Sequence, residues 1–75
     1  MKAPKIFAGT RLRQARERAG LTQRALAVEL GISPSYLNQI EAEQRPLTAR
    51  LLARAAARLD LPSSYFQDGE DARLA

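Results

Sequence analysis

Two short amphipathic segments separated by only three residues constrain the fold of this chain more than any other feature. Residues 23–30 and residues 34 to about 43 both place their apolar side chains at helical spacing. Thr22 and Ser33 stand where helix N-caps are expected, and Gly31 supplies the positive φ that a tight turn needs. The spacing therefore predicts two short helices that pack closely across a glycine turn.

The N-terminal part of the chain predicts a longer helix from about Lys5 to Ala19. Apolar residues recur on one helical face at 4-3-4 spacing: Ala8, Leu12, Ala15 and Ala19. Gly9 inside a helix costs about 1 kcal/mol relative to alanine, which indicates that another element packs closely against it. Gly20 is placed to end this helix.

The C-terminal part predicts one more full helix, capped by Thr48 and running through Leu59. Asp60 follows it, and aspartate tolerates the left-handed conformation that ends many helices. Residues 62–66 are expected to form a last short turn. Isoleucine and valine number only four, and apolar and polar residues nowhere alternate over the length of a strand.

These patterns predict an all-α fold, a compact bundle of five short helices in a single domain over residues 1–75. We expect an ordered core over about residues 5–67 and a flexible polar tail over 68–75. A chain of 75 residues buries only about 60–65% of its unfolded surface, so it has no room for a deep substrate cavity.

The composition excludes several classes of function. The chain has no cysteine and no histidine, which rules out disulfides, the usual zinc sites and the commonest general base. No apolar run approaches the roughly 18 residues of a membrane span, and no signal peptide is recognisable at the start. We therefore expect a cytoplasmic protein that is not an enzyme and has no cofactor, metal or membrane partner.

Charge is distributed unevenly along the chain. Residues 1–30 carry seven basic and two acidic side chains, residues 31–60 carry four and three, and residues 61–75 carry one and three. The chain as a whole has a net charge of +4. A basic front half followed by an acidic end indicates a polyanionic partner for one face, although solubility alone also favours a basic surface.

The second helix of the closely joined pair divides its residues between two faces. Two helices joined by a glycine turn over residues 22–43 form the helix-turn-helix layout, in which the second helix lies in the DNA major groove. At 100° per residue, Leu37 and Ile40 seat this helix on the first, and three polar residues fall on the opposite side: Ser35, Asn38 and Gln39. Amide side chains suit adenine and serine is adaptable. We expect this strip to read bases, with Pro34 and Tyr36 beside it.

The segment RLRQARERAGLTQRALAVELGISPSYLNQIEAEQRPLT resembles the Xre/Cro family of helix-turn-helix repressors. The resemblance covers roughly residues 6–66 and depends on three motifs in combination: L-T-Q, L-A-x-x-x-G-I and L-x-x-I-E. SPSYLNQIE followed by QRPLT is most similar to the N-terminal domain of bacterial short-chain fatty acid metabolism regulators, which are much longer. The resemblance implies a lambda-repressor-like DNA-binding domain, either excised from a longer regulator or standing alone.

The resemblance also implies roles for individual residues. Gln23 would contact phosphate and brace the third helix, and Arg45 would approach the DNA backbone. Arg16 and Glu41 match an internal ion pair that joins the first helix to the third. Further candidates for phosphate contact are Arg13, Arg24 and Ser33. Many phage repressors have glutamine where this chain has Pro34, which lacks a donor for a base, so base readout shifts toward the polar strip.

Each of these assignments has an ordinary structural alternative. The polar strip is also compatible with an ordinary solvated helix face. The same alternative holds for a basic stripe on the fourth helix, formed by Arg50, Arg54 and Arg58. The arginines of the first helix are mostly expected in solvent. Tyr36 fits equally well as a cover for the edge of the core. Phe7, Tyr65 and Phe66 fit core or dimer contacts better than base stacking.

The expected function is sequence-specific binding of double-stranded DNA by a bacterial transcriptional regulator. We expect a repressor that acts as a homodimer on a pseudo-palindromic operator. The alternative is a protein-interaction module on the same fold, such as an antitoxin that binds a partner protein.

Overall fold

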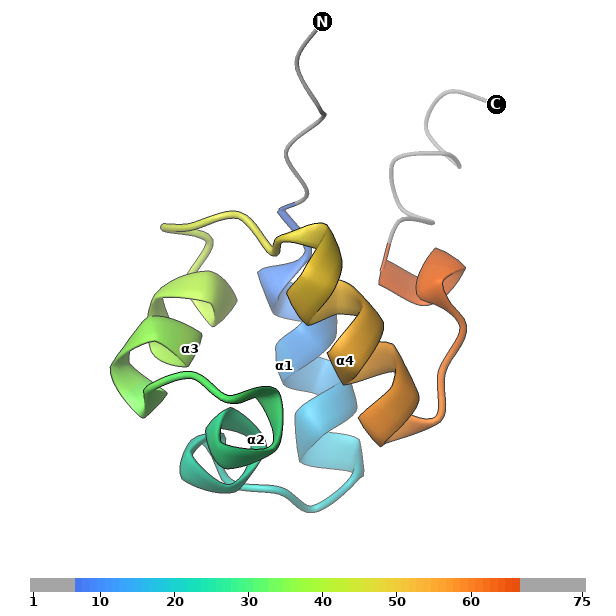
Figure 1. Cartoon of the computed structure of the whole chain (residues 1–75), viewed down its shortest axis with the longest axis horizontal. Helices are drawn as coiled ribbons and strands as arrows, with labels where there is room; N and C mark the ends of the chain where they lie inside the picture. The colour runs from blue at the N-terminus through green and yellow to red at the C-terminus, as the bar shows by residue number, and fades with distance from the viewer. Residues whose placement is uncertain (1–6, 67–75) are drawn as a thin grey trace, which may run out of the picture.

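The computed structural model describes residues 7–66, which form four α-helices and one 3₁₀ helix (Figure 1). The elements in chain order are α1 (Gly9–Arg18), α2 (Gln23–Leu30), α3 (Pro34–Glu41), α4 (Ala49–Leu59) and η1 (Ser63–Phe66). The expected all-α class is confirmed, but only four of the five expected helices are α-helices, and a single 3₁₀ turn stands in place of the fifth. The ends of the expected ordered core, at residues 5–6 and 67, and the expected flexible tail over 68–75 lie outside the described residues.

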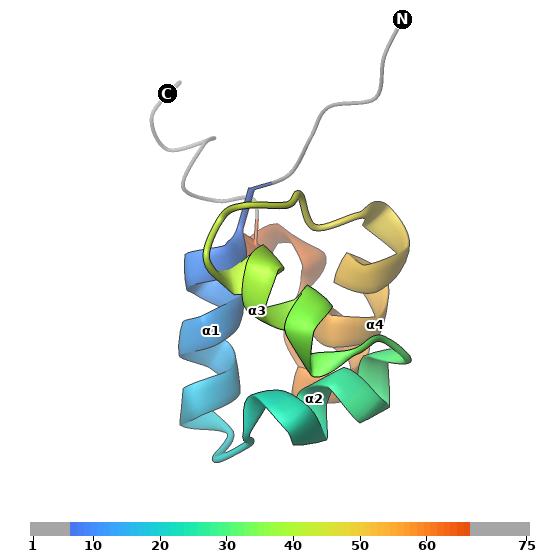
Figure 2. The same cartoon turned by 90° about the vertical axis from the view of Figure 1, so that its left-hand side faces the viewer.

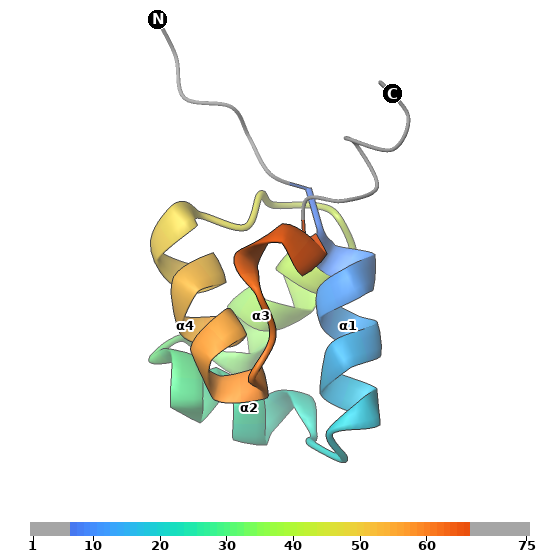
Figure 3. The ribbon, with the colours of Figure 1, turned by 90° about the vertical axis from the view of Figure 1, so that its right-hand side faces the viewer.

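The helices surround one core and leave one face of α3 open. α1 and α4 stand on opposite sides of the core, and α2 closes one end of it (Figure 2). α3 contacts both α1 and α2 and covers one of the remaining sides. η1 covers the other side by packing against α1 and α4 (Figure 3). The outer face of α3 is therefore turned away from the bundle.

The core consists mainly of aliphatic side chains from all four α-helices and from the loop before α4. The largest side chains that are fully buried are Leu12, Leu26, Leu30, Leu37, Ile40 and Leu47. Phe66 of η1 also packs into this cluster, where its side chain is 3% exposed, whereas Phe7 at the other end of the described chain is half exposed. No helix within residues 7–66 is long and apolar enough to cross a membrane.

Three of the four α-helices begin at the expected caps. The hydroxyls of Thr22, Ser33 and Thr48 accept hydrogen bonds from the backbone N–H three residues ahead, at 3.0, 3.0 and 3.2 Å. Such a cap satisfies one of the backbone donors that a helix start leaves unpaired. The predicted left-handed residues are also confirmed, with φ +73° at Gly31 and +59° at Asp60.

Two predicted helix boundaries are wrong, and Glu43 accounts for both. α1 begins at Gly9 rather than near Lys5, and α3 ends at Glu41 rather than at Glu43. Glu43 adopts φ +65° outside the helix, and its carboxylate accepts the backbone N–H groups of Gly9 and Thr10 at 3.1 and 3.3 Å. The N-cap residue of α1, Ala8, has no side chain that can cap the helix. Glu43, two residues after the end of α3, supplies the cap instead.

The predicted close approach at Gly9 is confirmed. A Cβ placed on Gly9 would lie 1.9 Å from the carbonyl oxygen of Ile40 and 2.9 Å from the Cα of Glu41. No side chain fits at these separations, because backbone atoms cannot move aside as the end of a flexible side chain can. Glycine at this position lets the start of α1 lie directly against the end of α3.

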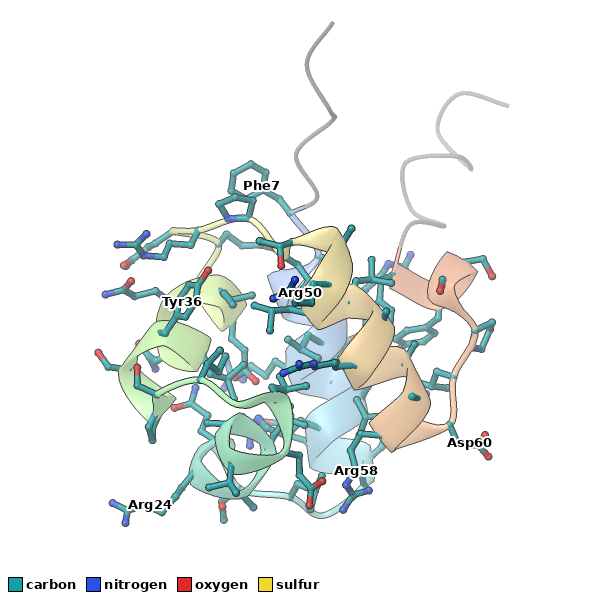
Figure 4. All side chains as sticks on the ribbon, in the orientation of Figure 1. Phe7, Arg24, Tyr36, Arg50, Arg58 and Asp60 are labelled. Carbon is teal, nitrogen blue, oxygen red and sulfur yellow. The ribbon has the colours of Figure 1, made fainter. Side chains whose placement is uncertain are left out.

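The basic stripe of α4 is not simply a solvated face. Arg54 donates to the carbonyl oxygen of Leu30 at 3.1 Å and so caps the C-terminus of α2. Arg58 pairs with Glu29 of α2 at 3.4 Å between exposed side chains, and Figure 4 shows Arg58 at the end of α4 nearest α2. Arg50, at the other end of the stripe, is exposed. The stripe therefore helps to hold α2 against α4.

The contact between α1 and α3 can be tested with Gly9→Ala. We expect this variant to lower the free energy of unfolding by about 2–3 kcal/mol, since the new methyl group overpacks backbone atoms that cannot move aside. Urea denaturation followed by far-UV circular dichroism measures the change.

Gly20→Ala is the matched control. Gly20 has φ +74° but nothing lies within 4 Å of a Cβ placed there, so the variant should lose only the roughly 1 kcal/mol of a left-handed alanine. Equal losses in the two variants would mean that α3 does not press on Gly9.

Candidate nucleic-acid interface

The outer face of α3 presents the predicted polar strip. Leu37 and Ile40 are fully buried beneath the helix. On its outer side, Ser35 and Asn38 are exposed and Gln39 is half-buried. Figure 2 looks onto this side of the molecule, where α3 is the element nearest the viewer. The structure thus brings the three predicted base-reading residues onto one accessible helix face.

Pro34 and Tyr36 lie beside the strip at the start of α3. Pro34 occupies the first turn of the helix and is exposed, and the Ser33 hydroxyl that caps this turn accepts the N–H of Tyr36. Tyr36 is half-buried and packs against the core, and Figure 4 shows it pointing out from α3. The tyrosine therefore covers the edge of the core beside the strip.

A polar network joins the strip to the frame of the domain. Arg16 of α1 forms a bidentate ion pair with Glu41 of α3, with Nε–Oε2 and Nη2–Oε1 distances of 2.8 and 3.1 Å. Gln23 of α2 donates to the same carboxylate at 2.9 Å. Asn38 in turn donates to the Gln23 side-chain oxygen at 3.5 Å. Three helices are thus connected through one carboxylate.

The ion pair is well shielded from water. The Glu41 side chain is 3% exposed and that of Arg16 is 11% exposed. The hydrogen bond to Glu41 raises the pKa of Arg16 above its usual value, so the guanidinium stays charged under all ordinary conditions. Arg16 also donates to the carbonyl oxygen of Leu21 at 2.8 Å, which ties the loop after α1 into the same cluster.

Three of the predicted phosphate-contact residues lie on the helices that pack against α3: Arg13 on α1, and Gln23 and Arg24 on α2. Arg13 lines a polar hollow of about 230 Å³ together with Asn38 and the Arg16–Glu41 cluster, and it pairs with Glu17 at 3.3 Å in solvent. Arg24 is exposed on α2, and Figure 4 shows its side chain pointing away from the bundle, below α3 in that view. Gln23, by contrast, uses its side chain within the network.

Arg45 makes contacts that its sequence position did not indicate. Its Nε donates to the side-chain oxygen of Gln39, and its guanidinium carbon lies 5.6 Å from the centre of the Tyr36 ring. Arg45 itself is exposed in the loop between α3 and α4. A loop residue is thus attached to the polar strip.

Arg11 has a structural contact rather than a position in solvent. It donates to the carbonyl oxygen of Tyr65 at 3.2 Å and lies over the Tyr65 ring, 5.7 Å from its centre. This contact ties η1 to α1.

Within residues 7–66 no cluster of three acidic side chains is arranged to hold a metal ion.

Comparison with known proteins identifies close relatives. The helix-turn-helix family model matches residues 12–66. The transcriptional regulators PrpR and RamB of Mycobacterium tuberculosis are 49% and 46% identical over 70 residues, or 93% of this chain. A propionyl-CoA carboxylase regulator of Cereibacter sphaeroides is 36% identical over 72 residues. The chain spans only 14–16% of the length of these relatives.

Comparison with solved structures identifies proteins of similar fold. The controller protein C.AhdI of Aeromonas hydrophila, from a restriction-modification system, superposes with a TM-score of 0.73 and 31% identity over 81% of this chain and 92% of its own. The clp gene regulator ClgR of Corynebacterium glutamicum gives a TM-score of 0.78 at 25% identity, over 100% of this chain and 97% of its own. The biofilm regulator SinR, solved in complex with DNA, gives 0.74 at 28% identity, over 80% and 97%.

The ion pair can be tested with Arg16→Met, Glu41→Met and the double variant. Arg16→Met leaves a buried carboxylate without its cation and should lower the free energy of unfolding by about 3–5 kcal/mol. The double variant replaces the pair by apolar side chains, so it should be more stable than Arg16→Met alone. Urea denaturation of the four proteins gives the coupling energy, and simple additivity of the two single losses would argue against a coupled pair.

Proposed function

The chain belongs to the helix-turn-helix family, and from this we propose that it is a sequence-specific DNA-binding domain of a transcriptional regulator. The observation that carries the proposal is the outer face of α3, where Ser35, Asn38 and Gln39 stand together on a helix seated by Leu37 and Ile40. Its relatives are named as transcriptional regulators, and SinR has been solved in complex with DNA.

In this proposal α3 lies in the major groove. The strip faces the base edges, which are distinguishable in that groove by their donors and acceptors. Pro34 and Tyr36 lie at the rim of the contact, where the tyrosine ring reaches a thymine methyl group or a phosphate. An eight-residue helix is long enough for this role, since only three or four side chains need to reach the bases.

Phosphate contacts on both sides of the groove set the position of α3. The proposed contacts come from residues that surround the strip: Arg13, Gln23, Arg24, Ser33 and Arg45. Gln23 and Ser33 lie at the starts of α2 and α3, where unpaired backbone N–H groups attract anions. The arginines supply the affinity that is common to all sequences.

We further propose that the protein represses transcription as a homodimer on a pseudo-palindromic operator in the cytoplasm. Two copies related by a two-fold axis place their α3 helices in successive major grooves, about one helical turn apart. This assembly doubles the number of base contacts that an 8.3 kDa domain can make.

Selection from random duplexes tests the proposed function directly. We expect the selected sequences to share a two-fold symmetric consensus whose half-sites are centred about 10 base pairs apart. A consensus without symmetry would contradict the dimer. The absence of any consensus, together with tight binding to another protein, would favour the protein-interaction alternative.

Asn38→Ala and Arg24→Ala separate base readout from phosphate contact. Asn38→Ala should weaken binding to the selected operator by about 1–3 kcal/mol and leave binding to unrelated duplexes unchanged. Arg24→Ala should weaken both and reduce the slope of affinity against salt concentration by about one unit. Fluorescence anisotropy at several salt concentrations measures both effects, and a changed consensus in Arg24→Ala would contradict its assignment.

A further inference from the structure

Arg45 and Gln39 form a hydrogen bond that fixes the orientation of one amide in the strip. The donor is the Arg45 Nε and the acceptor is the Gln39 side-chain oxygen. A guanidinium carries N–H donors and no acceptor, so only the oxygen end of the amide can face it. The amide nitrogen of Gln39, with its two N–H groups, is therefore the end that points away from Arg45.

Tyr36 holds the arginine in place. The Arg45 guanidinium lies over the tyrosine ring, and that ring is half-buried against the core. Attraction between the cation and the ring, added to the hydrogen bond, favours this position of an otherwise exposed arginine. The orientation of Gln39 is thus set by a contact that leads back to the core.

The neighbouring amide is oriented by a different partner. The Glu41 carboxylate accepts from the Gln23 amide nitrogen, which turns the Gln23 oxygen toward Asn38. Asn38 donates to that oxygen and keeps its own side-chain oxygen, together with one N–H, for another partner. The two amides of the strip therefore differ: Asn38 offers both an acceptor and a donor, and Gln39 offers its donors.

We propose that Arg45 is a positioning residue which presents Gln39 as a hydrogen-bond donor, so that Gln39 selects guanine. Guanine displays two neighbouring acceptors in the major groove, O6 and N7, whereas adenine pairs N7 with an N6 donor that requires an acceptor oxygen. Arg45 occupies one of the two lone pairs of the Gln39 oxygen and keeps a positively charged donor beside the other, which opposes the approach of the adenine N6 donor. This inference rests on the proposed function, and it revises the expectation that both amides read adenine.

The first test locates and identifies the base that Gln39 contacts. Selection from random duplexes is run with the 75-residue chain and with Gln39→Ala, and the base pair whose preference disappears in the variant is the one Gln39 contacts. We expect a G·C pair there, and 7-deazaguanine at that position should weaken binding because it removes N7. An A·T pair would overturn the inference while leaving the proposed function intact.

The second test uses Arg45→Lys, which keeps the positive charge for phosphate but removes the guanidinium that holds the Gln39 oxygen. Discrimination is the ratio of the affinities for G·C and A·T at the Gln39 position, so any change common to all duplexes cancels. This ratio should fall about tenfold. Gln39→Glu is the companion variant, because a carboxylate keeps the arginine contact but has no donor, and it should lose the guanine preference as well.

Arg50→Lys is the control, since Arg50 is an exposed arginine of α4 that is not among the proposed DNA contacts, and its replacement should not affect discrimination. Circular dichroism confirms that each variant is folded. Unchanged discrimination in Arg45→Lys, or a change at a different base pair, would overturn the role of Arg45 alone. Failure of the unmodified chain to select any consensus would overturn this inference and the proposed function together.

Discussion

The attachment of α3 to α1 is the contact on which the rest of this domain depends. Three separate interactions make it: the Arg16–Glu41 ion pair, the close backbone approach at Gly9, and the Glu43 carboxylate on the first N–H groups of α1. All three involve the last turn of α3 and the residues just after it. They fix the tilt and depth of a helix that is only eight residues long and could not hold its position through its own apolar face alone.

A buried ion pair is by itself weak grounds for stability, because removing two charges from water offsets most of their attraction. The arrangement around Glu41 indicates what this pair does in addition. Its carboxylate accepts from Gln23 as well as Arg16, and Gln23 accepts from Asn38. The pair therefore determines how a chain of neutral amides is oriented, and this chain ends on the outer face of α3. The residues that stabilise the contact between α1 and α3 thus also orient the face of α3 that we propose to read DNA.

The local features of the fold were predictable because short-range chemistry decides them. The three hydroxyl caps, the left-handed Gly31 and Asp60, and the two faces of α3 each follow from a few adjacent residues. The contacts that were missed join distant residues: Glu43 with Gly9, Arg54 with Leu30, and Arg45 with Gln39. No local pattern marks them. Glutamate rarely adopts a positive φ, and the reason it does so here lies 34 residues away.

Contacts between the polar strip and residues outside α3 limit how the residues of the strip can change. None of the three residues of the strip contributes a buried side chain, so they can be exchanged without loss of the core. Two of them, however, have partners outside the strip: Asn38 has Gln23, and Gln39 has Arg45. A replacement at either position removes this hydrogen bond and with it the arrangement of the partner side chain. Relatives that bind other operators on this fold should therefore differ in pairs of residues, at positions 23 and 38 or at 39 and 45, rather than within α3 alone.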